Sequence, residues 1–325
     1  MRKKVILTKR FGEKEVEILR DKYDLIVIED EKSDFKEIID DNKDAEALIP
    51  FLSDTIGKEI IDSMKNLKII ANYAVGYNNI DFKYAGEKGI FVTNTPDILT
   101  DATADLTLAL ILGVSRRIVE SDKYMKGGRF KGWGANLLLG RELKGLTIGI
   151  IGLGKIGLAT AIRAKAFGMN IVYNSRTVNN DAEKEYGFEY KNLEELIRIS
   201  DIISLHLPYS PDVHRMFNSK TFGMMKKGSI FINVARGGLM DEDALADVLE
   251  SGHLFGAGLD VFENEPAVNQ RLTKMDNVIM TPHTGSATNS ARSGMGQMVI
   301  TNIEKALSGS MPVNIIPELK NMIKY

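Results

Sequence analysis

The sequence predicts an α/β protein with two doubly wound domains, each built on a parallel sheet, and a cleft between them. Strand-like and helix-like segments alternate along nearly all of the 325 residues, which is the order that βαβ units produce. The strand candidates are apolar at successive positions, as in IISL (202–205) and IFINV (230–234). Such runs are typical of parallel strands covered on both faces. The alternation restarts near residue 145, which indicates a second unit.

The individual elements follow from these runs. Strands are expected at 4–7, 25–29, 45–49, 67–71 and 90–92 in the first unit, and at 147–151, 170–173, 201–205, 229–233, 256–260 and 277–280 in the second. Helices are expected at 13–20, 55–64, 155–167 and 241–250, with a long helix at 101–118 joining the units and another at 287–307. The final residues should fold back onto the first unit.

Composition excludes several classes of protein. The net charge of −2 offers no basic excess to neutralise the phosphates of a nucleic acid. The chain has no cysteine, which removes disulfides, thiolate catalysis and cysteine-ligated metals and fits a reducing cytoplasm. No metal site is expected. We expect no signal peptide at the N-terminus, where charged residues follow only a few consecutive apolar ones, and no apolar run approaches the ~20 residues that cross a bilayer.

A glycine-rich turn, GIIGLGKIG (149–157), lies between a strand-like run and a helix-like run. In a βαβ unit, Gly152 would permit the tight turn, Gly154 would let the backbone approach a pyrophosphate, and Gly157 would let helix pack on strand. The N–H groups at the helix start would face the phosphates. A turn that binds nothing is the plainer alternative. We therefore expect a Rossmann-like dinucleotide-binding domain at 100–287 and a flavodoxin-like, substrate-binding domain at 1–99 with about 288–325.

Three side chains follow strands of the second unit, where open α/β sheets bind ligands. They are Arg236, Glu265 and His283. Histidine titrates in the range useful for moving a proton to or from a substrate oxygen. A carboxylate would stabilise its protonated form, and an arginine can bind a substrate carboxylate through two parallel hydrogen bonds. The set predicts hydride transfer at an oxygen-bearing carbon, although a surface ion pair or a solvated loop would explain Arg236 or Glu265 taken alone.

The other three histidines compete with His283 for the acid–base role. His206 ends the strand of DIISLHLP and is the serious rival, at a position near a cofactor. His214 follows Pro-Asp in a loop or helix start, and His253 lies at a helix end on the opposite edge of the sheet.

Several segments carry a family resemblance. VARGGLMDEDAL, GAGLDVFENEP and TPHTGSAT, in this order after GIIGLGKIG, resemble the D-isomer-specific 2-hydroxyacid dehydrogenase family. NYAVGYNNID, VTNTPDILTDATADLTLALIL and GWGANLLLGRELKG match it in the first half, so the resemblance covers nearly the whole chain. Within the family, TDATADL, the GW segment and PHTGSAT are most similar to glyoxylate/hydroxypyruvate reductases.

The resemblance implies a homodimer that reduces a small 2-oxo acid with NADH or NADPH to the D-2-hydroxy acid. Arg236 would bind the carboxylate and carbonyl, and His283, paired with Glu265, would protonate the carbonyl oxygen. Further substrate contacts are implied for the N–H groups of Val75 and Gly76, for Leu52 and for Ser286. Thr103 would meet the pyrophosphate and Asp260 the nicotinamide amide. The full cofactor set is Thr103, Gly152, Gly154, Lys155, Ile156, Gly157, Ser175, Arg176, Thr177, His206, Pro208, Val234, Ala235, Asp260, His283 and Gly285. Plainer alternatives are an ordinary turn at Val75–Gly76, a helix hydroxyl bonded to its own backbone at Thr103, and a turn aspartate at Asp260.

The strand at 170–174 favours NADPH over NADH. It ends in Ser175, Arg176 and Thr177, without the acid that usually bonds the ribose 2′-hydroxyl of NAD. These three side chains can bind a 2′-phosphate, which a carboxylate would repel. Arg176 could instead stack on adenine, which leaves NADH open.

Trp133 is the only tryptophan and lies in GRFKGWGANLLLG, after the joining helix. Local packing is its plainer reading. The resemblance implies that it reaches the substrate pocket of the partner subunit, where a large ring would favour short acids. Alternatives for the whole chain are a short phosphoglycerate or D-lactate-type dehydrogenase, or a dinucleotide-sensing corepressor that binds without catalysis.

Overall fold

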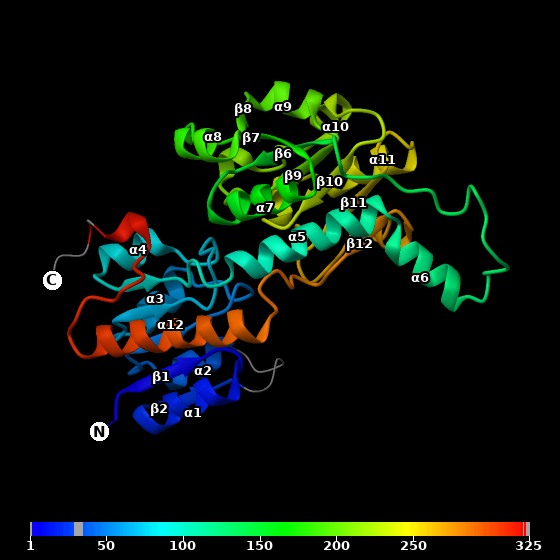
Figure 1. The fold of residues 1–325 in the computed structure, drawn as a ribbon. Coiled ribbons are helices and arrows are strands. Elements are labelled where there is room, and N and C mark those ends of the chain that lie inside the picture. The colour runs from blue at the N-terminus through cyan, green and yellow to red at the C-terminus, as the bar shows by residue number, and fades with distance from the viewer. Residues whose placement is uncertain (1, 29–34, 321, 323–325) are drawn as a thin grey trace. The chain divides into compact units, whose positions relative to one another are not determined.

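The computed structural model of the chain describes residues 2–28, 35–320 and 322. The chain divides into two compact units. Met1–Leu99 with Ala287–Tyr325 form the first, and Thr100–Ser286 form the second. Figure 1 labels the helices and strands of both units.

The first unit contains a five-stranded parallel sheet in the order β2-β1-β3-β4-β5. This is the 2-1-3-4-5 order of flavodoxin-like sheets, in which the direction of winding reverses between β1 and β3. Every residue of β3, β4 and β5 is buried. The strands are β1 (Lys4–Leu7), β2 (Asp24–Val27), β3 (Ala47–Ile49), β4 (Ile69–Ala71) and β5 (Phe91–Thr93).

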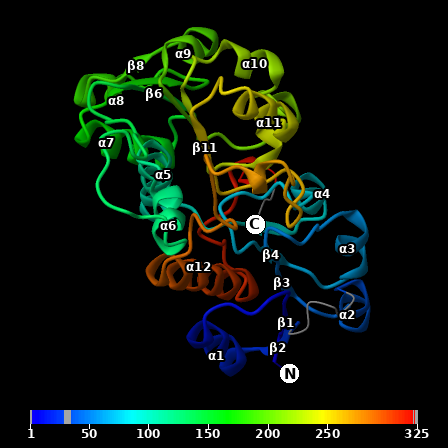
Figure 2. The same cartoon turned by 90° about the vertical axis from the view of Figure 1, so that its right-hand side faces the viewer.

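Helices cover both faces of this sheet (Figure 2). Helices α1 (Glu13–Lys22) and α12 (Asn289–Leu307) lie on one face, and α2 (Phe35–Asp41), α3 (Lys58–Ser63) and α4 (Phe82–Glu87) lie on the other. The buried carboxylate of Glu15 in α1 accepts a hydrogen bond from the Ser293 hydroxyl in α12 at 2.7 Å. This contact joins the C-terminal segment to the N-terminal one within a single unit.

The second unit contains a seven-stranded parallel sheet in the order β12-β11-β10-β9-β6-β7-β8. Read from β8 to β11 it follows the 3-2-1-4-5-6 order of dinucleotide-binding sheets, with winding reversed between β6 and β9. The strands are β6 (Thr147–Ile151), β7 (Asn170–Asn174), β8 (Glu189–Tyr190), β9 (Ile202–Leu205), β10 (Ile230–Asn233), β11 (Gly256–Leu259) and β12 (Val278–Met280).

Two apolar clusters pack against the two faces of the second sheet. Successive side chains of β9 show why the strands are apolar throughout: Ile202 belongs to one cluster and Ile203 to the other. Helices α5 (Thr100–Ser115) and α7 (Lys155–Ala166) pack together on one face, and α9 (Leu193–Ile199), α10 (Ser219–Met224) and α11 (Glu242–Glu250) cover the other. The remaining elements are α6 (Ile118–Lys126), α8 (Asn180–Tyr186) and the 3₁₀ turns η1 (Pro211–Val213), η2 (Gly237–Leu239), η3 (Leu272–Lys274) and η4 (Pro317–Leu319). The predicted fold class of two parallel α/β domains is confirmed.

Two predicted helices are wrong in their extent. The helix expected at 55–64 spans only Lys58–Ser63, because Ile56 pairs with Ile80 in an isolated β-bridge before the helix begins. The helix expected at 101–118 ends at Ser115, and Arg117 takes a left-handed conformation with φ of 53° before α6 begins at Ile118. The short strand β8 was not predicted, because both of its residues are exposed at the sheet edge. The other strand predictions agree with the structure within a few residues, except that the last residue of the strand predicted at 25–29 lies outside the described part of the chain.

Helix α6 and the residues after it project from the second unit as an arm (118–139; Figure 1). Large apolar side chains along this arm are exposed: Ile118, Val119, Met125, Phe130, Trp133, Leu137 and Leu139. Among the described residues, no helix is both long enough and apolar enough to cross a bilayer.

Candidate active site

The glycine-rich turn connects β6 to α7, next to the reversal of the second sheet. Gly152 has a φ of 98°, and a Cβ on it would lie 2.8 Å from the backbone of His206. A Cβ on Gly157 would lie 2.1 Å from the carbonyl oxygen of Gly152, so only glycine lets α7 begin so close to the turn. A Cβ on Gly154 would meet no atom within 4 Å. No side chain caps α7, which begins at Lys155 and Ile156. The backbone at Gly154 is accessible and the first N–H groups of α7 have no side-chain cap, so both could contact a pyrophosphate.

The polar residues after β7 lie at the position where dinucleotide-binding folds contact the ribose 2′-hydroxyl or 2′-phosphate of the cofactor. Arg176 and Thr177 are exposed, and Ser175 donates a hydrogen bond to the Thr177 carbonyl at 2.5 Å. No carboxylate stands among these three residues. Val234, Ala235 and Pro208 lie beyond the ends of β10 and β9 on the same edge.

His283 and Glu265 meet at the carboxyl edge of the same sheet. His283 Nδ1 lies 2.8 Å from Glu265 Oε2, and Glu265 Oε1 accepts the N–H of Phe262 at 3.0 Å. Partial burial opposes ionisation of Glu265. The hydrogen bonds from His283 and Phe262, with the charges of His283 and Arg236, outweigh it and lower the pKa of Glu265. The carboxylate is therefore ionised beside the imidazole at neutral pH.

Asp260 organises the turn that carries His283 (residues 281–285, the His283 turn). Its buried carboxylate accepts hydrogen bonds from the Thr281 hydroxyl at 2.5 Å, the Thr284 N–H at 2.7 Å and the Gly285 N–H at 2.8 Å. The Asp260 carbonyl accepts the His283 N–H at 2.9 Å, and His283 is left-handed with φ of 53°. Such a conformation costs roughly 1–2 kcal/mol. Asp260 thus holds a strained histidine in place.

Arg236 follows β10 and is fixed by its neighbours. Asn233, which is fully buried, donates to the Arg236 carbonyl at 2.9 Å and accepts the Ala235 N–H at 3.0 Å. The Arg236 guanidinium donates to the Ala235 carbonyl at 2.6 Å and interacts electrostatically with Glu265. Burial lowers the pKa of Arg236, and the charge of Glu265 opposes this. Arg236, Glu265 and His283 therefore converge on one edge of the sheet.

The other histidines lack this arrangement. Burial lowers the pKa of His206 to about 3, so its ring is uncharged at neutral pH and cannot act as an imidazolium acid. Its Nε2 lies 2.9 Å from the Ser204 hydroxyl. His253 Nε2 lies 3.0 Å from the Met225 carbonyl, and His214 lies beside Tyr209 and Glu263.

In the first unit, the loop after β4 presents consecutive peptide N–H groups. The carbonyl of Ala74 accepts the Thr95 N–H at 2.9 Å, that of Val75 accepts Asn94 Nδ2 at 2.8 Å, and that of Gly76 accepts Asn72 Nδ2 at 2.8 Å. In a trans peptide the N–H points opposite to the carbonyl. The N–H groups of Val75, Gly76 and the following residue therefore point away from the groups that bind the three carbonyls. Consecutive N–H groups of this kind can bind an anion.

The remaining predicted residues lie as follows. Leu52 is half-buried in the loop after β3, and Ser286 follows the His283 turn. Thr103 in α5 is buried, and its hydroxyl lies 3.2 Å from the Gly285 carbonyl, which belongs to the turn that carries His283. Trp133 is 88% exposed in the arm.

Sequence reasoning missed the residues that hold these groups. Asn72, Asn94 and Asn233 each hold a backbone segment through a side-chain amide. Their only signal in the sequence is a polar residue directly after an apolar strand, which is too common to single them out.

Comparisons with known proteins give consistent matches. Residues 108–285 match the family model for "D-isomer specific 2-hydroxyacid dehydrogenase, NAD binding domain". The glyoxylate reductase of Thermococcus litoralis is 44% identical over 321 residues, covering 97% of each chain. The crystal structure of a glyoxylate reductase from Paecilomyes thermophila is similar with a TM-score of 0.88 and 30% identity, over 98% of this chain and 99% of that one. An NADPH-dependent glyoxylate/hydroxypyruvate reductase from Sinorhizobium meliloti, in complex with NADP and malonate, has a TM-score of 0.88 and 31% identity over 98% of each chain.

Proposed function

The chain belongs to the D-isomer-specific 2-hydroxyacid dehydrogenase family, and we propose that it reduces glyoxylate or hydroxypyruvate with His283 as the proton donor. The match to the family model and the 44% identity to the Thermococcus litoralis enzyme confirm the predicted resemblance. The observation that carries the proposed role of His283 is the 2.8 Å contact between its Nδ1 and an ionised Glu265.

Each residue of the set has a chemical task in this proposal. His283 donates a proton from Nε2 to the carbonyl oxygen of the substrate as that oxygen becomes a hydroxyl. Glu265 accepts a hydrogen bond from the Nδ1–H group of His283, which fixes the ring, and its negative charge stabilises the imidazolium. Arg236 binds the substrate carboxylate or carbonyl through the N–H groups of its planar guanidinium. The N–H groups of Val75 and Gly76 bind the carboxylate, and Leu52 and Ser286 are proposed as further contacts.

A nicotinamide dinucleotide fits the second unit, because Gly152 and Gly157 permit the tight turn and the close helix start, and Gly154 leaves open space beside the backbone before a helix without a side-chain cap. When bound, it supplies the hydride. We propose NADPH over NADH, since Ser175, Arg176 and Thr177 offer a cation and hydroxyls where an acid would repel a 2′-phosphate. Thr103 and Asp260 remain proposed contacts to the pyrophosphate and the amide.

We propose a homodimer in which the arm contacts the second copy. Support comes from the arm's exposed apolar side chains, above all Trp133 at 88% exposed. Large apolar side chains exposed together on one projecting segment favour an interaction site over a free surface. We further propose a cytoplasmic location, in keeping with a chain that contains no cysteine.

The experiment is a substrate profile of the purified chain. NADPH or NADH oxidation is followed with glyoxylate, hydroxypyruvate, pyruvate and bulkier 2-oxo acids, and NAD(P)⁺ reduction is followed with phosphoglycerate. The proposal predicts the highest kcat/KM for glyoxylate or hydroxypyruvate. Preference for pyruvate or phosphoglycerate would favour the other dehydrogenase classes. Tight cofactor binding without turnover of any acid would favour a dinucleotide-sensing corepressor.

A further inference from the structure

Glu265 lies in a loop between β11 and η3 (residues 262–269, the Glu265 loop). Within this loop, its carboxylate accepts only the Phe262 N–H, and the Ala267 N–H donates to the Asn264 carbonyl at 2.8 Å. These short-range bonds shape the loop but do not attach it to the sheet or helices beside it. The placement of Glu265 toward His283 therefore depends on contacts from outside the loop.

The carboxylate of Glu242 makes one such contact at each end of the loop. Its Oε1 accepts the Glu263 N–H at 2.8 Å, and its Oε2 accepts the Asn269 N–H at 3.3 Å. Glu242 is the first residue of α11, and the N-cap Asp241 fixes that helix start by accepting the N–H groups of Asp243 and Ala244. One carboxylate on a capped helix thus clips both ends of the loop.

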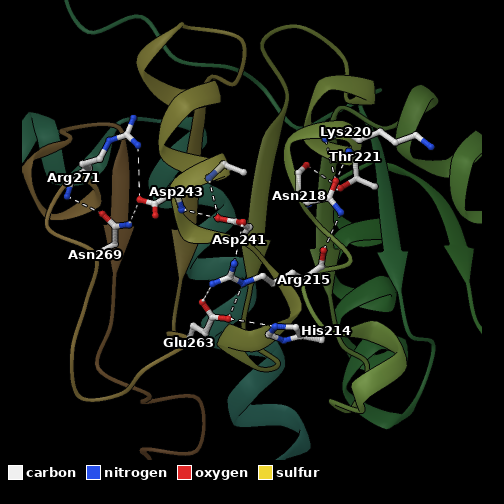
Figure 3. A network of polar contacts seen from close by, with 11 residues as sticks. His214, Arg215, Asn218, Lys220, Thr221, Asp241, Asp243, Glu263, Asn269 and Arg271 are labelled. Atoms are coloured by element: carbon white, nitrogen blue, oxygen red, sulfur yellow. Dashed lines mark hydrogen bonds and ion pairs between the residues drawn. The ribbon is translucent and has the colours of Figure 1, made fainter.

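Arg215 makes the second attachment (Figure 3). Its Nε and Nη2 each donate to the Glu263 carboxylate at 2.9 Å, and its Nη1 lies 3.4 Å from Asp241. The Arg215 N–H donates to the Gly238 carbonyl at 2.8 Å, which ties it to the segment that follows Arg236. The Glu263 side chain is only 15% exposed. Two parallel hydrogen bonds to a largely buried carboxylate fix the relative orientation of the two side chains better than an exposed ion pair does.

We propose that Glu242 and Arg215 are positioning residues, which hold the Glu265 loop so that Glu265 meets His283. This inference rests on the proposed acid–base role of His283. Neither residue needs to touch substrate or cofactor. If either contact is lost, the loop relaxes, Glu265 moves away from Nδ1, and the imidazolium loses part of its counter-charge. The charged groups that interact with Glu265 are His283 and Arg236.

The test is the pH profile of kcat/KM for 2-oxo acid reduction, which should fall on the alkaline side as the proton donor deprotonates. Glu265→Gln should move that fall to lower pH by about one unit or more, because an opposite charge is removed. Glu242→Ala and Arg215→Lys should move it in the same direction by roughly half as much, with the dissociation constant of NADPH unchanged. Adding Glu242→Ala to Glu265→Gln should cause no further shift, because both changes act through one carboxylate.

Two matched controls come from the same network. Asp243→Ala removes the neighbouring acid of α11, which accepts a hydrogen bond from the Asn269 side chain, whereas Glu242 accepts the backbone N–H groups of Glu263 and Asn269. Arg271→Lys removes a second forked arginine, which binds Asp247 and Glu250 instead of Glu263. Both should keep the wild-type profile.

The outcomes separate this inference from the proposed function. If Glu265→Gln shifts the profile but Glu242→Ala, Glu242→Gln and Arg215→Lys do not, the positioning role is wrong and the acid–base role stands. If Glu265→Gln itself shifts nothing, the acid–base role fails. Should Glu242→Ala not fold, Glu242→Gln and Arg215→Lys still decide the question, because each retains the size of the side chain.

Discussion

Nδ1 of His283 lies 2.8 Å from Oε2 of Glu265, and the two residues come from turns that follow neighbouring strands of one parallel sheet. Because Nδ1 is engaged by the carboxylate, Nε2 is the nitrogen left to exchange a proton with a substrate. The left-handed backbone of His283, held by Asp260, aims the ring. The proposed reaction depends on this pair of residues.

Arg236→Lys should lower kcat/KM substantially although the charge is kept. Lysine lacks the planar fork that binds a carboxylate at two points. The loss is expected to be on the order of tenfold to a hundredfold, as for a hydrogen bond to a charged group worth about 1.5–3 kcal/mol. Steady-state kinetics with glyoxylate measure it. An Arg236→Lys enzyme with full activity would show that this residue does not bind the substrate carboxylate.

Arg176→Ala should raise the KM for NADPH and leave that for NADH nearly unchanged, because only NADPH carries the 2′-phosphate. Arg198→Ala, which removes an exposed arginine of α9 paired with Glu194, is the control and should change neither value. Equal increases for both cofactors would mean that Arg176 holds the adenosine, and the preference for NADPH would lose its basis.

Trp133→Ala should weaken the preference for glyoxylate and hydroxypyruvate over longer 2-oxo acids, because the ring would no longer shorten the pocket of the second subunit. Light scattering on the wild-type protein should give the mass of a dimer. A monomer, or an unchanged ranking of substrates in the variant, would return Trp133 to a local packing role.

His206 should make the unfolding free energy depend on pH. Its pKa is about 3 in the folded chain and near 6.5 when exposed, so the unfolded chain binds a proton first as pH falls. The stability contributed by the neutral ring is complete above pH ~6.5 and decreases toward pH ~3. Denaturant unfolding of the cofactor-free protein at pH 7 and pH 5 should show a smaller difference in His206→Leu than in wild type, by up to about 2 kcal/mol. His214→Leu serves as the control, because the His214 side chain is half-exposed, and it should keep the wild-type difference. Equal differences in wild type and His206→Leu would refute the prediction.

The sequence predicted the strands and the Arg236, Glu265 and His283 set because both leave local signals. Parallel strands are apolar runs, and ligand-binding side chains follow them directly. The end of α5 left no such signal. The Ser115 carbonyl is satisfied by the Arg141 N–H at 2.8 Å, and a Cβ on Gly140 would lie 2.4 Å from that carbonyl oxygen. A chain segment distant in the sequence ends the helix, so propensity alone could not place its end.

The supporting residues of the site were out of reach for the same reason. Glu242 and Arg215 act on a loop that lies 20 or more residues further along the chain, and Asn72 and Asn94 orient peptides through side-chain amides. Such bonds are fixed by the three-dimensional path of the chain and follow no residue spacing.

The most direct test of the central claim compares His283→Ala with wild type in NADPH-dependent reduction of glyoxylate, with the dissociation constant of NADPH measured on both. We expect kcat to fall on the order of 10²–10⁴-fold in the variant, the range for a lost general acid, while the dissociation constant of NADPH changes by no more than about twofold. Near-normal turnover in His283→Ala, together with loss of turnover in His206→Ala, would contradict it and assign the proton donor to the other histidine.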